Sequence, residues 1–134
     1  VEYLEELLPD ATIENHPYLP QQDVVDFCRP KGIHITAYSP LGSTGSPLMK
    51  DEAIQEVAKR HSVSAGAVLL SYHVARGNSV LAKSVTPSRI EENRNIIELD
   101  SSDMKALEKI SKDKGMTRFI YPAFGVNLGF SDKQ

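Results

Sequence analysis

The 134-residue sequence predicts an α/β fold in which short parallel strands alternate with helices. Three segments have the apolar character of buried strands: one around Ile13, one over 33–38 and one over 79–82. Helical apolar spacing fills most of the chain between and after them. Because a parallel sheet is covered by helices on both faces and has further strands beside it, the sequence predicts one part of a larger α/β domain.

The first half of the chain contains two predicted helices and two predicted strands. Apolar residues at helical spacing predict a helix over 1–8, followed by a short strand around Ile13. A second helix is predicted over 21–28 with Phe27 among its inward residues. Alternating apolar and polar residues then predict a strand that begins at Ile33 and runs into a Ser-Pro-Leu-Gly turn.

The second half of the chain is predicted to be mostly helical. Ser64 is the expected N-cap of one helix, and Thr86 is the expected N-cap of another whose first residue is proline. The predicted elements are, in order, helices over 51–61 and 65–76, a buried strand over 79–82, and helices over 87–96 and 101–112. The last segment, 115–134, has no helical or strand period, and we expect it to be an ordered tail that lies over another part of the fold.

Composition excludes several classes of protein. The chain is 40% hydrophobic and 25% charged with a net charge of −3, which is ordinary for a soluble globular domain and argues against a broad nucleic-acid-binding face. No apolar run is long enough to span a bilayer, so we expect no membrane partner. A single cysteine, Cys28, excludes an internal disulfide and favours a reducing, cytoplasmic location. Because the chain opens on Val1 rather than Met, we expect it to be part of a longer protein.

A tyrosine stands at the carboxyl end of the second predicted strand, in the sequence AYSPLGS (37–43). In parallel α/β sheets, ligands bind at this end of the strands. The ring of Tyr38 offers a flat surface to a planar ligand, and the hydroxyls of Ser39 and Ser43 suit a pyrophosphate. A ring that simply fills the end of the fold explains Tyr38 equally well.

Two cations and two hydroxyls follow the third predicted strand, in the sequence LAKSVTPSRIEEN (81–93). Helix-start chemistry with solvated charges is one interpretation. The other is a phosphate site, because Lys83 and Arg89 can donate charge-assisted hydrogen bonds near the unpaired N–H groups of a helix start. Two such loops together suggest an extended phosphorylated ligand such as a dinucleotide, although no G-x-G-x-x-G or G-x-x-x-x-G-K-[ST] motif occurs.

These two motifs, together with IENHPYLPQ (13–21), resemble the aldo-keto reductases, which are NADPH-dependent enzymes built on a (β/α)8 TIM barrel. The resemblance covers nearly all of 1–134 and identifies the chain as the second, carboxyl-terminal half of such a barrel, incomplete as given. It implies an oxidoreductase that reduces small aldehydes or ketones to alcohols with NADPH, and a substrate-side tail over 115–134. It leaves the substrate and the oligomeric state open.

The resemblance also implies the role of individual residues. Tyr38 would stack on the nicotinamide, and the loop after it would line the pyrophosphate. The second motif would hold the adenosine 2′-phosphate and the adenine, which explains its cations as a preference for NADPH over NADH. The implied cofactor-binding residues are Tyr38, Ser39, Leu41, Ser43, Lys83, Ser84, Val85, Thr86, Arg89, Glu92 and Asn93.

The sequence departs from the family in two places. The family's catalytic Asp, Tyr, Lys and His belong to the first half of the barrel, so no catalytic residue is assigned here, and no metal site is predicted. The residues that are not given these roles are Tyr3, His16, Tyr18, Lys31, His34 and His73, and of these His16 and His73 are interpreted as structural. The family usually has Asn-Gln before the Glu-x-His-Pro stretch to hold the nicotinamide carboxamide, where this chain has Ala11 and Thr12.

We therefore expect the chain to bind the cofactor without turning over substrate. A non-catalytic NADP(H)-binding module and an interaction fragment are the alternatives. With so few strands, we also expect unpaired strand edges and an uncovered apolar sheet face at Ile33, Ile35, Val80 and Leu81, and hence self-association or marginal stability.

Overall fold

Three strands form one parallel sheet in the order β1-β2-β3. They are β1 (Asp10–Glu14), β2 (His34–Tyr38) and β3 (Ser79–Leu81). Asp10 lies beside His34 in the first pairing, and Thr36 lies beside Ser79 in the second. All three predicted strands are confirmed, and sequential parallel pairing agrees with the predicted α/β class.

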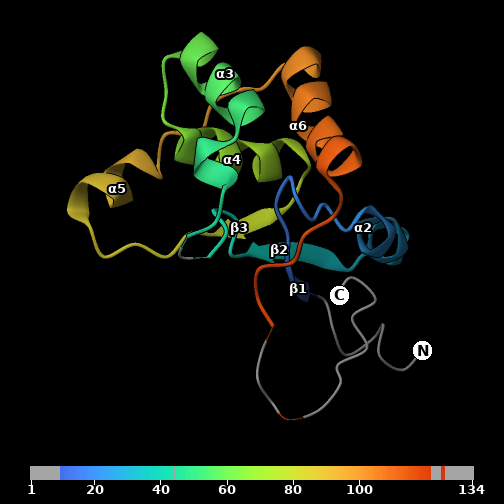
Figure 1. The fold of residues 1–134 in the computed structure, drawn as a ribbon. Coiled ribbons are helices and arrows are strands. Elements are labelled where there is room, and N and C mark those ends of the chain that lie inside the picture. Colours follow the sequence, from blue (N-terminus) through green and yellow to red (C-terminus); the bar gives the residue numbers. More distant parts are fainter. Residues whose placement is uncertain (1–9, 44, 122–124, 126–134) are drawn as a thin grey trace.

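Helices make the crossover connections that parallel strands require. The helices are α2 (Gln22–Cys28), α3 (Glu52–His61), α4 (Ala65–Ala75), α5 (Pro87–Glu92) and α6 (Ser101–Lys114), with short 3-10 helices η1 (Arg29–Lys31) and η2 (Leu48–Lys50). The first crossover contains α2, and the second contains α3 and α4. In Figure 1, α3, α4 and α6 lie together on one side of the sheet, whereas α5 projects from the end that carries β3.

The structure is a computed structural model that describes residues 10–43, 45–121 and 125. The predicted helix over 1–8 and most of the predicted tail over 115–134 lie outside these residues. Within the described part of the chain, every helix is too short or too polar to cross a bilayer.

Local capping fixes the starts of the two helices in the second crossover. The Asp51 carboxylate accepts a hydrogen bond from the Ala53 N–H at 3.0 Å and begins α3. The Ser64 hydroxyl accepts one from the Ala67 N–H at 3.1 Å and begins α4, as the sequence predicts. Each cap satisfies a backbone donor that a helix start leaves without an internal partner.

Two apolar clusters hold these elements together. The larger one lies between α3, α4 and α6 and includes Ile54, Val68 and Leu107, which are fully buried. The smaller one joins the sheet to α2 through Ile35, Val25 and Cys28. The buried thiol of Cys28 is therefore part of the core.

Two expectations about burial are wrong, those for Phe27 and Ile35. Phe27 was expected inside but is 52% exposed. Leu81 is 59% exposed, which agrees with the expectation of an uncovered residue there but not with a buried strand. Ile35 is buried against α2, so the apolar face of the sheet is covered. The opposite face carries polar residues instead, including His34, whose Nε2 lies 2.8 Å from the Ser79 hydroxyl.

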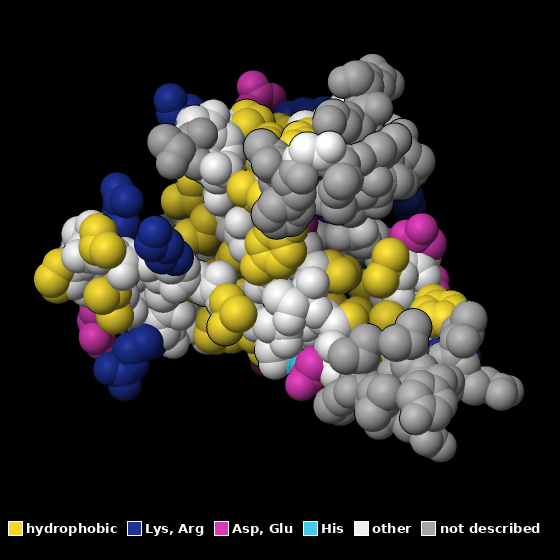
Figure 2. Space-filling model, turned by 90° about the horizontal axis from the view of Figure 1, so that it is seen from below, with side chains coloured by type: hydrophobic (Ala, Val, Ile, Leu, Met, Phe, Trp, Pro, Cys, Tyr) yellow, Lys and Arg dark blue, Asp and Glu magenta, His cyan; other side chains and the backbone are white. Residues whose placement is uncertain are grey.

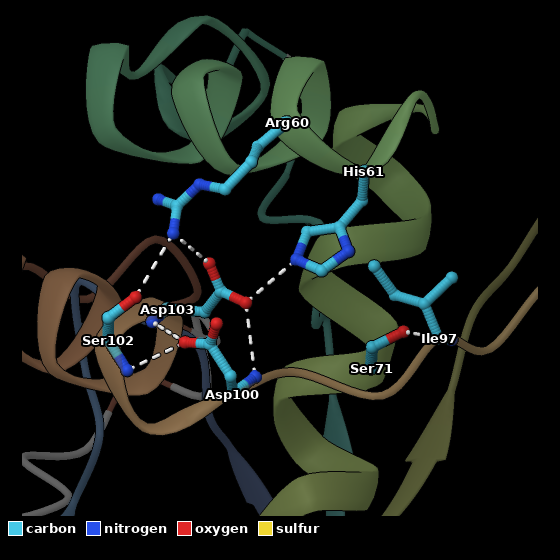
Figure 3. Close-up of polar contacts among 7 residues, drawn as sticks. All are labelled: Arg60, His61, Ser71, Ile97, Asp100, Ser102 and Asp103. Carbon is cyan, nitrogen blue, oxygen red and sulfur yellow. Dashed lines mark hydrogen bonds and ion pairs between the residues drawn. The ribbon is translucent and has the colours of Figure 1, made fainter.

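A buried carboxylate joins the end of α3 to the start of α6 (Figure 3). Asp103 forms a hydrogen bond with His61 Nε2 at 2.7 Å and an ion pair with Arg60 Nη1 at 2.9 Å. It also accepts a hydrogen bond from the Asp100 N–H at 3.1 Å, while the Asp100 carboxylate accepts one from the Asp103 N–H. This reciprocal capping box fixes the start of α6, the helix that follows α5 in the chain.

Candidate functional site

The loop after β2 is a tight turn that depends on glycine. Ser39 has a φ of 50°, and its carbonyl accepts a hydrogen bond from the Gly42 N–H at 2.8 Å. Gly42 has a φ of 75°, and a Cβ there would lie 2.1 Å from the Ser46 hydroxyl oxygen. A side chain at this position would therefore be strained and would also collide with the loop. Positive φ at a non-glycine residue such as Ser39 is a form of strain that often marks functional sites.

The loop after β3 is held by its own hydroxyl. The Ser84 oxygen accepts a hydrogen bond from the Thr86 N–H at 3.2 Å. Thr86 is the N-cap residue of α5 as predicted, but its side chain makes no capping hydrogen bond. Because α5 has only six residues, its backbone is a weak source of anion binding, and any preference for phosphate has to come from the side chains.

The two cations of this loop are exposed and available to a ligand. Among the residues that the structure describes, neither Lys83 nor Arg89 forms an ion pair with an acidic side chain. By contrast, the nearby Arg94 lies 3.5 Å from the Glu91 carboxylate. Figure 2 shows Lys and Arg side chains on the lobe at the left, which is the α5 end of the molecule.

Both loops open onto one cleft of about 630 Å³. The cleft contains every predicted cofactor-binding residue except Tyr38 and Ser39. Its lining residues are Leu41, Gly42, Ser43, Met49, Ser64, Gly66, Lys83, Ser84, Val85, Thr86, Arg89, Glu92 and Asn93. Two segments about forty residues apart in sequence thus meet around one space, as parallel strands with adjacent carboxyl ends require.

Residues at the start of α4 and before α3 complete the cleft, and the sequence did not assign them to a site. Ser64 was predicted only as a helix cap, while Gly66 and Met49 carried no functional signal. A Cβ at Gly66 would meet only the Met49 methyl and the Ser64 oxygen, both at 3.7 Å. A small residue so close to a helix start could be noticed in the sequence, but its approach to the two loops depends on tertiary packing.

Tyr38 lies beside the cleft as the last residue of β2, where it is half-buried. It pairs in register with Glu14 of β1. Burial raises the pKa of the Tyr38 hydroxyl, the Glu14 charge raises it further, and Arg118 partly offsets both. The hydroxyl is therefore neutral at physiological pH and presents an uncharged ring at the carboxyl end of the sheet.

Glu14 is a buried acid that the sequence analysis did not single out. Its side chain lies 3.0 Å from His16 Nε2 and 3.8 Å from Arg118 Nη1. It also accepts hydrogen bonds from the N–H groups of Phe119 at 2.7 Å and Ile120 at 3.1 Å. The signal in the sequence was an acidic residue within a predicted strand. A charge that is buried there needs several partners, so it indicates specific contacts with other parts of the chain.

His73 and Tyr18 are buried in the interior of the fold. His73 is buried in α4, where burial and the charges of Arg76 and His16 lower its pKa to about 3. The Tyr18 hydroxyl donates to the Asp51 carboxylate at 2.8 Å. Among the described residues, no three His, Cys, Asp or Glu side chains are grouped as metal ligands would be.

Comparison with known proteins places these features in context. The model of the aldo/keto reductase family matches residues 10–112. The chain is 57% identical over 98% of its length to D-galacturonate reductase of Hypocrea jecorina, and 50% identical over 87% of its length to glycerol 2-dehydrogenase (NADP(+)) of Saccharomyces cerevisiae. It covers 46% and 38% of those two proteins, so it spans less than half the length of each.

Solved structures agree with the sequence comparison. A crystal structure of a Gox0644 mutant in complex with NADPH matches with a TM-score of 0.71 and 31% identity. The match covers 75% of this chain and 37% of that chain.

Proposed function

Because the chain belongs to the aldo/keto reductase family, we propose that its cleft binds NADPH and that it is the cofactor-binding, carboxyl-terminal half of a (β/α)8 carbonyl reductase. The observation that carries this proposal is the convergence of the 37–43 and 81–93 motifs on one cleft. A volume of about 630 Å³ also lies within the range of small-molecule sites.

The chemistry of the cleft suits a dinucleotide that carries an extra phosphate. Lys83 and Arg89 would bind the 2′-phosphate, because Arg can donate two parallel hydrogen bonds to it. Glu92 and Asn93 would contact the adenine, and Ser43 would contact the pyrophosphate. Tyr38 lies outside the cleft at the end of β2, where its uncharged ring would stack on the nicotinamide.

Bound NADPH would supply a hydride to the carbonyl carbon of a small aldehyde or ketone. The residues of this chain would bind and orient the cofactor, and none is assigned as the general acid. The names of the two relatives support a carbonyl or polyol substrate, since one is a D-galacturonate reductase and the other a glycerol 2-dehydrogenase. A reducing, cytoplasmic location belongs to the same proposal because Cys28 is a free, buried thiol.

Cofactor choice provides the direct test. We expect the chain to bind NADPH more tightly than NADH, and Arg89→Ala to weaken NADPH binding about tenfold or more while leaving NADH binding unchanged. The expected loss is about 1.5–3 kcal/mol, because the change removes a charge-assisted bond to the 2′-phosphate. Fluorescence titration of each nucleotide measures this.

Arg94→Ala is the matched control, since Arg94 is an exposed arginine near the same helix but does not line the cleft. Equal affinity of the unaltered chain for NADPH and NADH would contradict the 2′-phosphate assignment. A loss of NADPH affinity in the Arg94 variant as large as in the Arg89 variant would show that the effect comes from overall positive charge and not from a contact with the 2′-phosphate.

A non-catalytic binding module is the second candidate function, because no residue of the chain is assigned to the family's catalytic roles. The purified chain should then bind NADPH but show no NADPH oxidation with a panel of aldehydes. Turnover above a protein-free control would contradict this and would require a general acid within 1–134.

A further inference from the structure

The buried carboxylate of Glu14 is bonded to a segment that lies more than one hundred residues later in the chain. It accepts hydrogen bonds from two successive backbone N–H groups, those of Phe119 and Ile120, at 2.7 and 3.1 Å. The Arg118 guanidinium lies 3.8 Å from the same carboxylate, and Arg118 is itself buried. Three consecutive residues of the tail are thus held by one side chain.

Further contacts fix the same short stretch from other directions. The Thr117 N–H donates to the Tyr18 carbonyl at 2.9 Å. The Phe119 ring lies 4.8 Å from the His16 ring and 6.0 Å from the Tyr18 ring, measured between centroids. Figure 1 shows this part of the chain, after α6, crossing the carboxyl end of the sheet.

This contact lies next to Tyr38. Glu14 and Tyr38 are register partners on adjacent strands, and the Asn15 N–H donates to the Tyr38 carbonyl at 3.4 Å. The charges of Glu14 and Arg118 both act on the Tyr38 hydroxyl, one raising its pKa and the other lowering it. The start of the tail and the ring at the end of β2 therefore share one electrostatic environment.

A buried charge is an expensive way to hold a loop if stability is the only requirement. An apolar side chain of similar size would bury the same surface without the desolvation penalty of a carboxylate. What a carboxylate adds is direction, because its two oxygens accept from two defined donors and fix where the tail begins. That geometry, rather than stability alone, points to a role in placing the tail.

We propose that Glu14 is a positioning residue that fixes the start of the carboxyl-terminal tail, 117–120, beside Tyr38 and so sets one wall of the substrate side of the cofactor site. The contact itself stands on the geometry of this chain. Its role in the site rests on the proposed function, in which Tyr38 stacks on the nicotinamide.

Residue-resolved amide exchange in the full 134-residue chain, compared with Glu14→Gln, tests the contact. Glutamine keeps the shape but removes the charge and one acceptor, so the amides of Phe119 and Ile120 should exchange at least about tenfold faster. Amides in α3 and α4 should be unaffected. Glu98→Gln, which changes an exposed glutamate, is the control and should leave both tail amides unchanged.

NADPH binding to the same variants tests the role. The affinity should stay within about twofold, because the cleft residues that hold the nucleotide are untouched. The fluorescence of bound NADPH should shift toward that of the free cofactor, because the wall beside the nicotinamide has moved. A residue that only stabilises the fold would not separate affinity from the nicotinamide signal in this way.

A second pair of variants applies if Glu14→Gln does not fold. Ile120→Pro removes the N–H that donates to Glu14, whereas Ile120→Ala keeps it, so only the proline variant should loosen the Phe119 amide and shift bound-NADPH fluorescence. Unchanged tail exchange, or uniform acceleration throughout α3 and α4, would overturn the proposal. Absence of NADPH binding in the unaltered chain would overturn the proposed function and the role in the site, while amide exchange would still decide the tail contact.

Discussion

His73 is a buried histidine held in its neutral form. Its side chain is fully buried within α4, and burial, with the charges of Arg76 and His16, lowers its pKa from 6.5 to about 3. The unfolded chain therefore binds a proton at His73 below about pH 6.5, whereas the folded chain does not. Its contribution to stability is complete above that pH and is lost progressively as the pH falls toward 3.

We expect the free energy of unfolding to fall by roughly 1 kcal/mol between about pH 7.5 and pH 5.5 because of His73. His73→Gln should remove this part of the pH dependence, since glutamine does not titrate. Urea denaturation at the two pH values measures the difference, with His34→Gln as an exposed control. An identical pH dependence in the unaltered chain and the His73 variant would contradict the prediction.

Contiguous motifs let the sequence group residues that the fold brings together, although their role in cofactor binding stays a prediction. Eleven positions within 37–43 and 81–93 are assigned from side-chain chemistry and resemblance, and nine of them line the cleft. Ser64 and Gly66 were missed because α4 reaches the cleft only through tertiary packing. Phe27 was placed inside because it is apolar, but Val25 and Cys28 are three residues apart and already form the buried stripe of α2.

At the scale of elements, one carboxylate decides how α6 meets α3. Asp103 has no exposed side-chain surface, while its partners Arg60 and His61 keep 44% and 27% of their side chains exposed. Solvent therefore partly screens the two partners of this carboxylate, so the network stabilises the fold less than a fully buried ion pair would.

Asp103→Ala should lower the free energy of unfolding by about 2 kcal/mol. It removes one half of the capping box and leaves Arg60 and His61 of α3 without the carboxylate that they contact. Asp113→Ala is the control on the same helix, because Asp113 forms only an exposed i,i+4 pair with Lys109 at 3.5 Å and should cost less than about 0.5 kcal/mol. Denaturant melts of both variants measure this; equal losses would show that the buried network adds nothing.

The sequence predicts the existence and order of elements better than their burial. Helix starts were readable because capping is local, as at Ser64. The burial of β3 cannot be read from its apolar run because it depends on neighbours: this strand has β2 on one side and no described partner strand on the other. An apolar run alone does not reveal which strands will stand beside it.

At the scale of the whole molecule, the sheet ends at β1 and β3, and neither outer edge pairs with another described strand. The open face between them is polar, but apolar side chains are exposed near its β3 end, where Leu81 is 59% and Val85 is 87% exposed. Unpaired edges beside exposed apolar side chains favour association.

We expect the isolated chain to form dimers or larger species at micromolar concentration. Leu81→Lys should shift it toward monomer, because the lysine places a charge beside the free edge of β3. Phe27→Lys is the control. Phe27 lies on α2 and is exposed to nearly the same extent as Leu81, and its substitution should leave the association unchanged. Sedimentation velocity measures all three, and a monomeric unaltered chain with a sharp cooperative melt would contradict the expectation.

The lining of the cleft comes from a single stretch of the chain, 41–93, whereas the tail contact joins residues 105 positions apart. Closing a loop costs more entropy as the loop lengthens, and contacts near in sequence form sooner during folding. We therefore expect the nucleotide-binding cleft to form early in folding, and the contact between Glu14 and the tail to form last. During folding, the part of the site that binds the cofactor would then be complete before the substrate side.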